Sequence, residues 1–302
     1  MWKDYEFNVI TASSGVFTVQ DGFTIRAVHI SDLYPDSVSI KSLGGGNLDI
    51  SADDIEQGSI GDCWLLSALS VIAQKDKQKL EDMILRSNSV EGWTDVCILN
   101  QNIRVDHFIP CVCSAKNEIV QILAPKLSFQ KEYWPIILEK AIIKFFSCHR
   151  CPVHIKNMLL RKRIEKRLPL VGPSYNDIHG GFPRWVFSLL YNVNLDPIQT
   201  QRQPKLWSKI LSHKDVLACA CTSCELNDTH QSDGFVYGHA YAILGASDGL
   251  IRVRNPWGVY ENSKYADDVD DGSFWVDEEQ FREKFPHIVM LKLTRREIFT
   301  NS

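Results

Sequence analysis

Apolar and polar positions follow a helical period over much of the chain and the two-residue period of strands toward its end. The clearest helix is expected to begin at Cys63, because the apolar run over residues 64–73 is interrupted only by Ser67 and Ser70. Further helices are expected over residues 76–87, 128–146, 156–168, 185–191 and 206–217, and strands over residues 96–100, 103–113, 118–124, 216–221, 234–246, 250–255 and 272–276. The pattern predicts an α+β fold.

The change of pattern near residue 213 predicts two lobes. Residues 32–213 are expected to form a mainly helical lobe that carries Cys63, and residues 214–302 a β-rich lobe that carries His239 and Asn255. Residues 1–31 contain short apolar pieces and a turn signal at Asp21-Gly22. They predict two or three strands in an N-terminal extension of unknown role.

The composition is that of a globular protein with no global attraction to nucleic acid. The chain has 302 residues, 44% of them hydrophobic, and a net charge of -4. The N-terminus lacks the apolar core of a signal peptide, and no apolar run approaches the roughly 20 residues of a membrane span. Nine cysteines, an odd number, indicate free thiols in a reducing compartment. We therefore expect a cytoplasmic protein without a membrane segment or a nucleic-acid partner.

Residues 156–168, KNMLLRKRIEKRL, form a basic helical patch. A solvated helix face, a docking site for an acidic partner and a localisation signal are all compatible with this charge pattern.

The stretch QGSIGDCWLLSALSVIA places one cysteine at the start of the long apolar helix. Gly58 and Gly61 are expected to allow a tight turn before it, and Asp62 is a candidate N-cap. Cys63 then lies in the first helical turn, where unpaired N–H groups and the helix dipole favour a thiolate. The alternative is a buried structural cysteine, which is the common role of a single cysteine on an apolar helix.

His239 and Asn255 flank a hairpin signal at Ser247-Asp248-Gly249. If the turn centres on Ser247, the two residues lie opposite each other, within one or two places of register. The amide oxygen of Asn255 would then accept from one imidazole nitrogen, and the other could exchange a proton with a thiol. Taken singly, His239 is also compatible with an ordinary strand histidine and Asn255 with a turn amide.

These residues follow the order Cys, His, Asn of papain-like peptidases. Three motifs, QGSIGDCWLLSAL, GHAYAILGA and RNPWG followed by DGSFW, resemble signatures of the calpain family of cysteine proteases, and YWPIILEKAIIK and HGGFPRW add weaker similarity. The resemblance implies a papain-like two-lobed protease core. In it Cys63 is the nucleophile, His239 the general base and acid, and Asn255 the orienting residue.

The resemblance also implies roles for Gln57 and Trp257. Gln57 is similar in position to the family glutamine whose side chain joins the oxyanion hole, and Trp257 to the tryptophan that gates the cleft between lobes.

Calcium is a further implication of the resemblance, with one ion in each lobe. Asp54 matches a ligand of the first site, and Asn176 and Asp177 are the nearest candidates for its acidic partner. The second site is matched by three acidic residues and has a serine where a glutamate is usual. These positions are Glu261, Asp268, Asp271 and Ser273. A missing carboxylate lowers calcium affinity, so calcium dependence stays open.

A zinc site is a competing interpretation of two cysteine pairs. Cys148-x-x-Cys151 and Cys221-x-x-Cys224, with His149 and His154 nearby, offer ligands of the right type but lie 70 residues apart.

The sequence therefore predicts a calpain-like endopeptidase that acts on protein substrates through Cys63, with calcium as the candidate cofactor. The alternative is a catalytically silent core that serves as a binding or regulatory module. The oligomeric state is not encoded in any motif.

Overall fold

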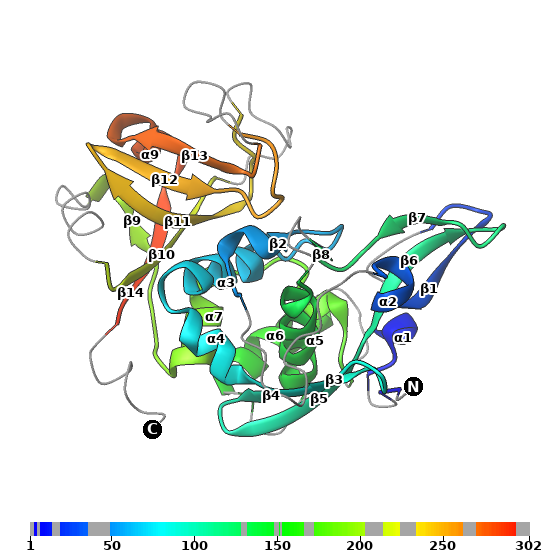
Figure 1. Cartoon of the computed structure of the whole chain (residues 1–302). Helices are drawn as coiled ribbons and strands as arrows, with labels where there is room; N and C mark the ends of the chain where they lie inside the picture. Colours follow the sequence, from blue (N-terminus) through cyan, green and yellow to red (C-terminus); the bar gives the residue numbers. More distant parts are fainter. Residues whose placement is uncertain are drawn as a thin grey trace. The chain divides into compact units, whose positions relative to one another are not determined.

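The computed structural model describes residues 3–4, 7–13, 19–35, 49–127, 132–147, 151, 153–165, 172–202, 214–223, 234–261 and 270–293 (Figure 1). Its helices are α1 (Val9–Ser13), α2 (Ile30–Leu33), α3 (Cys63–Lys75), α4 (Lys77–Met83), α5 (Trp134–Phe146), α6 (Val153–Glu165), α7 (Pro183–Tyr191) and α9 (Glu278–Lys284). Short 3₁₀ helices are η1 (Ala52–Asp54), η2 (Tyr175–Asp177) and η3 (Thr200–Arg202).

The strands are β1 (Phe23–His29), β2 (Ile55–Glu56), β3 (Ile84–Asn88), β4 (Trp93–Ile98), β5 (Gln101–Asp106), β6 (Phe108–Ser114), β7 (Ile119–Ile122), β8 (Lys126–Leu127), β9 (Ile198–Gln199), β10 (Val216–Cys221), β11 (Ala240–Ser247), β12 (Leu250–Arg254), β13 (Ser273–Asp277) and β14 (His287–Lys292). Helices and antiparallel sheets occur together, so the predicted α+β class is confirmed.

The chain packs into two compact units. Unit 1 consists of residues 1–50, 56–62 and 78–180, and unit 2 of residues 51–55, 63–77 and 181–302. This division differs from the predicted lobes, because α3 is assigned to the same unit as the C-terminal sheet. The apolar helix packs against β10 and β11 of that sheet, a long-range contact that local periodicity does not encode.

Unit 1 is built around α5, in which twelve of thirteen residues are buried. Two three-stranded sheets belong to the same unit, in the orders β1-β6-β7 and β3-β4-β5. The predicted helix over residues 76–87 ends earlier, at Met83, because Ile84 already enters the ladder with Val96 of β4.

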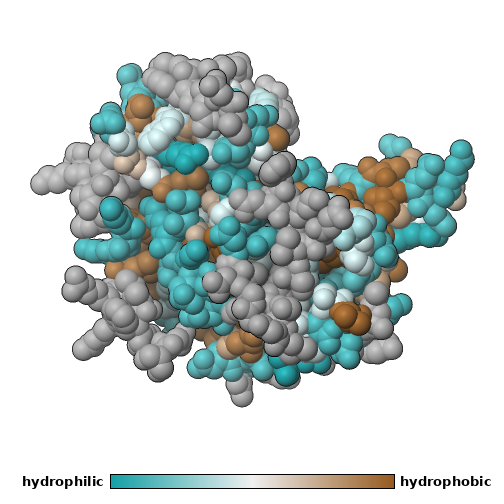
Figure 2. Space-filling view, viewed as in Figure 1, coloured by the Kyte–Doolittle hydropathy of each residue, from teal (hydrophilic) through white to brown (hydrophobic). Residues whose placement is uncertain are grey.

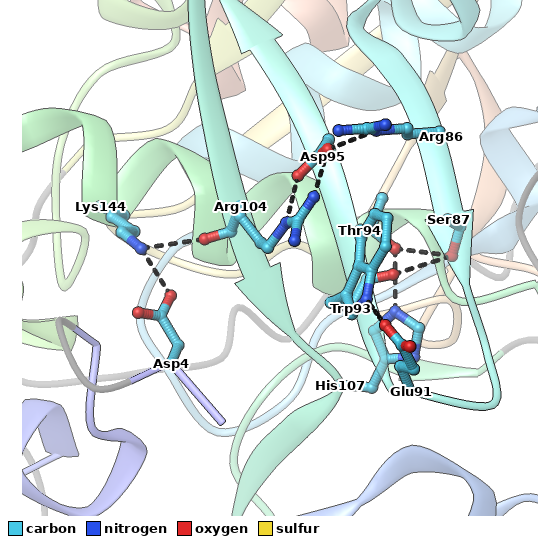
Figure 3. A network of polar contacts seen from close by, with 10 residues as sticks. All are labelled: Asp4, Arg86, Ser87, Glu91, Trp93, Thr94, Asp95, Arg104, His107 and Lys144. Atoms are coloured by element: carbon cyan, nitrogen blue, oxygen red, sulfur yellow. Dashed lines mark hydrogen bonds and ion pairs between the residues drawn. The ribbon is translucent and has the colours of Figure 1, made fainter. Parts of the chain in front are cut away.

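The first 30 residues belong to unit 1 rather than forming a separate extension. Strand β1 pairs along its length with β6, from Phe23 opposite Ser114 to His29 opposite Phe108. The Asp4 carboxylate accepts a 2.7 Å hydrogen bond from the Lys144 ammonium, which also donates to the Arg104 carbonyl (Figure 3). Two or three strands are predicted in this segment, but Val9–Ser13 form the helix α1, and residues 14–18 lie outside the described residues.

Strand β7 forms an edge of its sheet and carries apolar surface (Figure 2). Ile119 and Val120 are 41% and 53% exposed.

Unit 2 contains a six-stranded antiparallel sheet in the order β13-β12-β11-β10-β14-β9 (Figure 1). Alternate residues of its central strands form an apolar cluster with Phe281 of α9 and Phe285 just after it. Leu217 and Cys219, which alternate with the cluster residues of β10, point to the opposite face and are fully buried. Among the described residues, no helix is long and apolar enough to cross a membrane.

Candidate active site

Cys63 is the first residue of α3, as the sequence predicts. In the first turn of a helix the backbone N–H groups have no acceptor within the helix, and together with the helix dipole they favour a thiolate. Cys63 is partly exposed, whereas Cys111 and Cys219 are fully buried. Partial exposure, which Cys97 and Cys221 share, fits a thiol that meets a substrate, and the position at the start of α3 distinguishes Cys63 from these two.

The glycines before Cys63 serve close packing rather than a special backbone conformation. Neither Gly58 nor Gly61 has a left-handed φ angle. A Cβ on Gly58 would overlap the carbonyl oxygen of Ala124, and a Cβ on Gly61 would lie 3.1 Å from the His179 ring. The expectation of a turn that needs glycine flexibility is therefore wrong, and the reason for glycine is the lack of space.

Asp62 does not cap α3 as predicted, because its side chain points into the protein. The side chain is fully buried, and neither carboxylate oxygen accepts a hydrogen bond from another described residue. Burial disfavours the charged form and raises the pKa of Asp62 to about 8, against a smaller lowering by its own backbone N–H. Glu139 on α5 is also fully buried, and burial followed by the charge of Asp62 raises its pKa.

The His239 imidazole is oriented by Asn255. Their Nε2 and Oδ1 atoms lie 2.8 Å apart. The same Oδ1 accepts the backbone N–H of Trp257 at 3.1 Å, while Asn255 Nδ2 faces the Tyr260 carbonyl at 3.4 Å. Because a backbone N–H can only donate, the atom it meets must be the amide oxygen. His239 therefore carries its proton on Nε2, and Nδ1 holds the lone pair that can accept a proton.

Aromatic side chains cover His239. The Tyr241 ring lies 5.1 Å away in an edge contact, and the Trp257 ring lies 4.9 Å away. His239 is 5% exposed. Burial lowers its pKa to about 4, although the bond to Asn255 acts in the opposite direction. At neutral pH the imidazole is therefore neutral, the state in which a general base accepts a proton.

The hairpin that brings His239 to Asn255 has a register within the expected range. Its turn residues are Asp248 and Gly249, both with positive φ, and the ladder pairs Ala242 with Arg254. By extension Asn255 faces Tyr241, two places from His239. The contact still forms, because diagonal neighbours on one face of a sheet are within reach.

A hydroxyl on α3 connects the nucleophile helix to the strand after His239. Ser67 Oγ donates a 2.7 Å hydrogen bond to the carbonyl of Ala240, the residue that follows His239. Cys63 and Ser67 are four residues apart and therefore lie on the same face of α3. The face of the helix that carries the thiol is thus the one held against the start of β11.

Thr222 is a supporting residue that sequence reasoning missed. Its hydroxyl accepts the His239 N–H at 3.0 Å and donates to the Val236 carbonyl at 2.7 Å. The Thr222 N–H donates to the His239 carbonyl at 3.0 Å. Both backbone groups of His239 are therefore fixed by one residue at the end of β10, a contact that no local motif reveals.

Gln57 is buried, and its side-chain N–H donates a 2.6 Å hydrogen bond to the Ile60 carbonyl. An amide NH₂ group carries two protons, so one proton stays available to another acceptor. This geometry is compatible with the oxyanion role that the sequence predicts for Gln57.

The candidate calcium ligands act as caps and loop anchors. Asp54 is fully buried and accepts the Ser51 N–H in a capping box. Glu261 accepts the Gly272 N–H and Asp271 the Ser273 N–H, each at 2.7 Å.

The described residues contain no group of three or more acidic, histidine or cysteine side chains arranged to hold a metal. The Arg252 guanidinium also lies 3.9 Å from the Asp271 carboxylate and adds positive charge there. Asp268 lies outside the described residues, so calcium binding stays a prediction.

Arg163, in the predicted basic patch, is a buried ion-pair partner rather than a solvated residue. Its Nε donates to the Asp177 carboxylate at 2.7 Å, and both side chains are at least nine-tenths buried. Asp177, a candidate partner of the calcium site, is therefore already bound to a guanidinium. Neighbouring Arg161 is exposed, as a solvated helix face predicts.

The predicted zinc ligands are only partly described. Cys148, His149 and Cys224 lie outside the described residues, while Cys151 belongs to unit 1 and Cys221 to unit 2. The seven described cysteines form no disulfide with one another.

Comparison with known proteins identifies similar sequences. A family model described as calpain family cysteine protease matches residues 45–270. The chain is 29% identical over 252 residues to the calpain-type cysteine protease DEK1 of Zea mays, and 24% identical over 277 residues to the calpain-2 catalytic subunit of Homo sapiens. Each match covers 80% of this chain, but only 10% of the maize protein and 36% of the human subunit. The chain therefore spans a minor part of the length of these relatives.

Proposed function

Because the chain belongs to the calpain family of cysteine proteases, we propose that it is an endopeptidase that cleaves protein substrates through the Cys63 thiolate. The observation that carries the proposal is the orientation of His239 by Asn255, with the imidazole proton on Nε2. This tautomer leaves Nδ1 as a base for a thiol. An ordinary strand histidine needs no such fixed tautomer.

The reaction begins with transfer of the Cys63 thiol proton to His239 Nδ1. The thiolate attacks the carbonyl carbon of the scissile peptide bond. The negative oxygen that forms accepts a hydrogen bond from the second side-chain N–H of Gln57. The imidazolium returns its proton to the departing amine as the carbon–nitrogen bond breaks, which leaves a thioester on Cys63. His239 then deprotonates a water molecule, whose oxygen attacks the thioester and releases the carboxylic acid and the thiol.

The buried site around His239 makes the neutral imidazole the resting state. When the imidazole takes the proton from Cys63, a thiolate forms beside it. The negative charge of this thiolate raises the pKa of His239. The Trp257 ring, 4.9 Å from His239, excludes water from the hydrogen bond to Asn255. The odd number of cysteines, nine, fits a reducing compartment, and we place the activity in the cytoplasm on that ground.

The test is cleavage of fluorescently labelled, unfolded casein by the purified chain, with calcium or with a chelator, beside Cys63→Ala. Cleavage by the parent chain and none by the variant supports the proposal. A requirement for calcium would support calcium activation, and equal rates with chelator would exclude it. No cleavage in either condition, together with a Cys63 that does not react with a peptide-like thiol-directed inhibitor, would contradict the proposal and favour the binding module.

A further inference from the structure

The backbone of Gly61, two residues before Cys63, is held through both its N–H and its carbonyl. Its N–H donates a 3.2 Å hydrogen bond to Nδ1 of His179, and its carbonyl accepts the Gly180 N–H at 2.6 Å. All of these atoms belong to unit 1. Two consecutive residues, 179 and 180, therefore fix the backbone donor and the backbone acceptor of one residue, Gly61, in the turn that leads into α3.

The contact between Gly61 and His179 is also a close packing contact. A Cβ on Gly61 would lie 3.1 Å from both Cε1 and Nδ1 of the imidazole, closer than such contacts ordinarily are. Since Gly61 has no left-handed φ angle, this proximity is the reason for a glycine at the position. The ring lies directly over the backbone of the turn.

His179 is itself held by a buried part of unit 1. Its backbone N–H donates a 3.1 Å hydrogen bond to the carbonyl of Tyr175, which is fully buried at the start of η2. Asp177 of the same 3₁₀ helix is fixed by the buried ion pair with Arg163 of α6. The imidazole therefore extends from a rigid base, as a positioning group requires.

Gly181 packs against the residue that follows the nucleophile. A Cβ on Gly181 would overlap the indole ring of Trp64, which follows Cys63 in α3. The segment 179–181 thus contacts the residue two places before Cys63 and the residue one place after it. This arrangement explains the sequence His179-Gly180-Gly181, because each of the three residues makes one of these contacts.

We propose that His179 is a positioning residue that holds the backbone of the turn before Cys63 through its unprotonated Nδ1. Because the Gly61 N–H can only donate, the histidine proton lies on Nε2. The proposal rests on the function of Cys63 as nucleophile. A nucleophile and its oxyanion donors must be held within a fraction of an ångström, and a misplacement of 1 Å can cost about a hundredfold in rate.

The test compares His179→Leu, which fills the space without an acceptor, with His179→Asn, whose side-chain oxygen can accept the Gly61 N–H. Four quantities are measured: kcat and KM for labelled casein, the rate of Cys63 alkylation by iodoacetamide read by mass spectrometry of its peptide, and the melting temperature. We expect His179→Leu to lower kcat and the alkylation rate about tenfold with KM nearly unchanged, and His179→Asn to recover most of the loss.

Two results would overturn the proposal. One is a His179→Leu variant with the kcat and alkylation rate of the parent chain. The other is a His179→Asn variant as slow as His179→Leu, because the acceptor would then be irrelevant. If the parent chain shows no Cys63-dependent cleavage, the proposed function fails, while the alkylation rates still decide whether His179 positions Cys63.

A second pair of variants covers the case in which His179→Leu does not fold. Gly61→Ala places a methyl group against the imidazole and is expected to slow Cys63 alkylation about tenfold in the parent chain. In a His179→Ala background the ring is absent, so the same change is expected to have little effect. An equal effect in both backgrounds would contradict the contact between Gly61 and His179 as the cause.

Discussion

The Ser67 hydroxyl and the Ala240 carbonyl form a 2.7 Å hydrogen bond that joins α3 to the residue after His239. The two residues are 173 positions apart in the sequence. Since Ser67 lies one helical turn after Cys63, this bond controls how the nucleophile helix is seated on the strand that follows the base.

Ser67→Ala leaves the buried Ala240 carbonyl without its donor. We expect a loss of about 1–3 kcal/mol in the free energy of unfolding and slower alkylation of Cys63. Ser70 provides the matched control, because it is equally buried on the same helix but its hydroxyl has no hydrogen-bond partner among the described residues. Ser70→Ala removes no hydrogen bond and is expected to cause no loss of stability. Urea titration of both variants measures the difference, and equal losses would contradict the account.

Asn255 is expected to matter less than the base that it orients. His239→Ala should lower kcat/KM for casein by roughly a thousandfold, the order of a lost general base, and Asn255→Ala by less. Asn255→Asp keeps an acceptor for Nε2–H and should retain more activity than Asn255→Ala. The added carboxylate also raises the pKa of His239, so the acid limb of the pH profile should move to higher pH. An acid limb that stays in place would argue against a contact between the two side chains in solution.

Asp62 is expected to lower stability as the pH rises. An unfolded aspartate ionises near pH 3.8, whereas the folded pKa of Asp62 is about 8. The stability contributed by its neutral form is therefore fully present below pH 3.8. It decreases as the unfolded state ionises above that pH, and it is lost once the pH has risen through about 8. Asp62→Asn removes this dependence, so its stability relative to the parent chain should increase by a few kcal/mol between pH 4 and pH 8.

The exposed Glu118 is the control for Asp62. Urea titrations of Glu118→Gln across the same pH range should run parallel to those of the parent chain. A stability difference between Asp62→Asn and the parent chain that does not change with pH would contradict the buried, neutral carboxyl.

The ion pair between Arg163 and Asp177 should be costly to break. Arg163→Met leaves a buried carboxylate uncompensated, and we expect a loss of about 3–5 kcal/mol in the free energy of unfolding. Adding Asp177→Asn should restore part of this loss, because the buried charge is then removed. Exposed Arg161→Met is the control and should change stability by less than about 0.5 kcal/mol. Equal effects of the two arginine variants would contradict the buried ion pair.

The sequence contains the local part of the candidate site but not the contacts that hold it. The apolar run places Cys63 at the start of a helix, and the Ser-Asp-Gly signal predicts the hairpin beside His239. The register could be predicted only to within two places, because the turn is Asp248-Gly249 and an irregularity between Ile243 and Gly245 shifts the ladder. Neither feature has a marker in the alternation of apolar and polar residues.

The partners of Ser67 and Gly61 could not be predicted for a different reason. Ser67 bonds to a residue 173 positions away, and Gly61 to His179, 118 positions away. Such contacts depend on tertiary packing, and a small or hydroxyl side chain in an apolar run does not indicate what it will meet. The packing of α3 against β10 and β11 could not be predicted for the same reason, because these strands lie far from α3 in the sequence.

The most direct test of the central claim is the pH dependence of Cys63 alkylation by iodoacetamide in the parent chain and in His239→Ala. A free thiol with a pKa near 8.5 has less than about 1% thiolate at pH 6. If Cys63 and His239 act as a pair, the parent chain should react nearly as fast at pH 6 as at pH 8. In His239→Ala the alkylation rate should fall roughly a hundredfold as the pH is lowered from 8 to 6. Identical profiles for the two proteins would contradict the pairing of nucleophile and base.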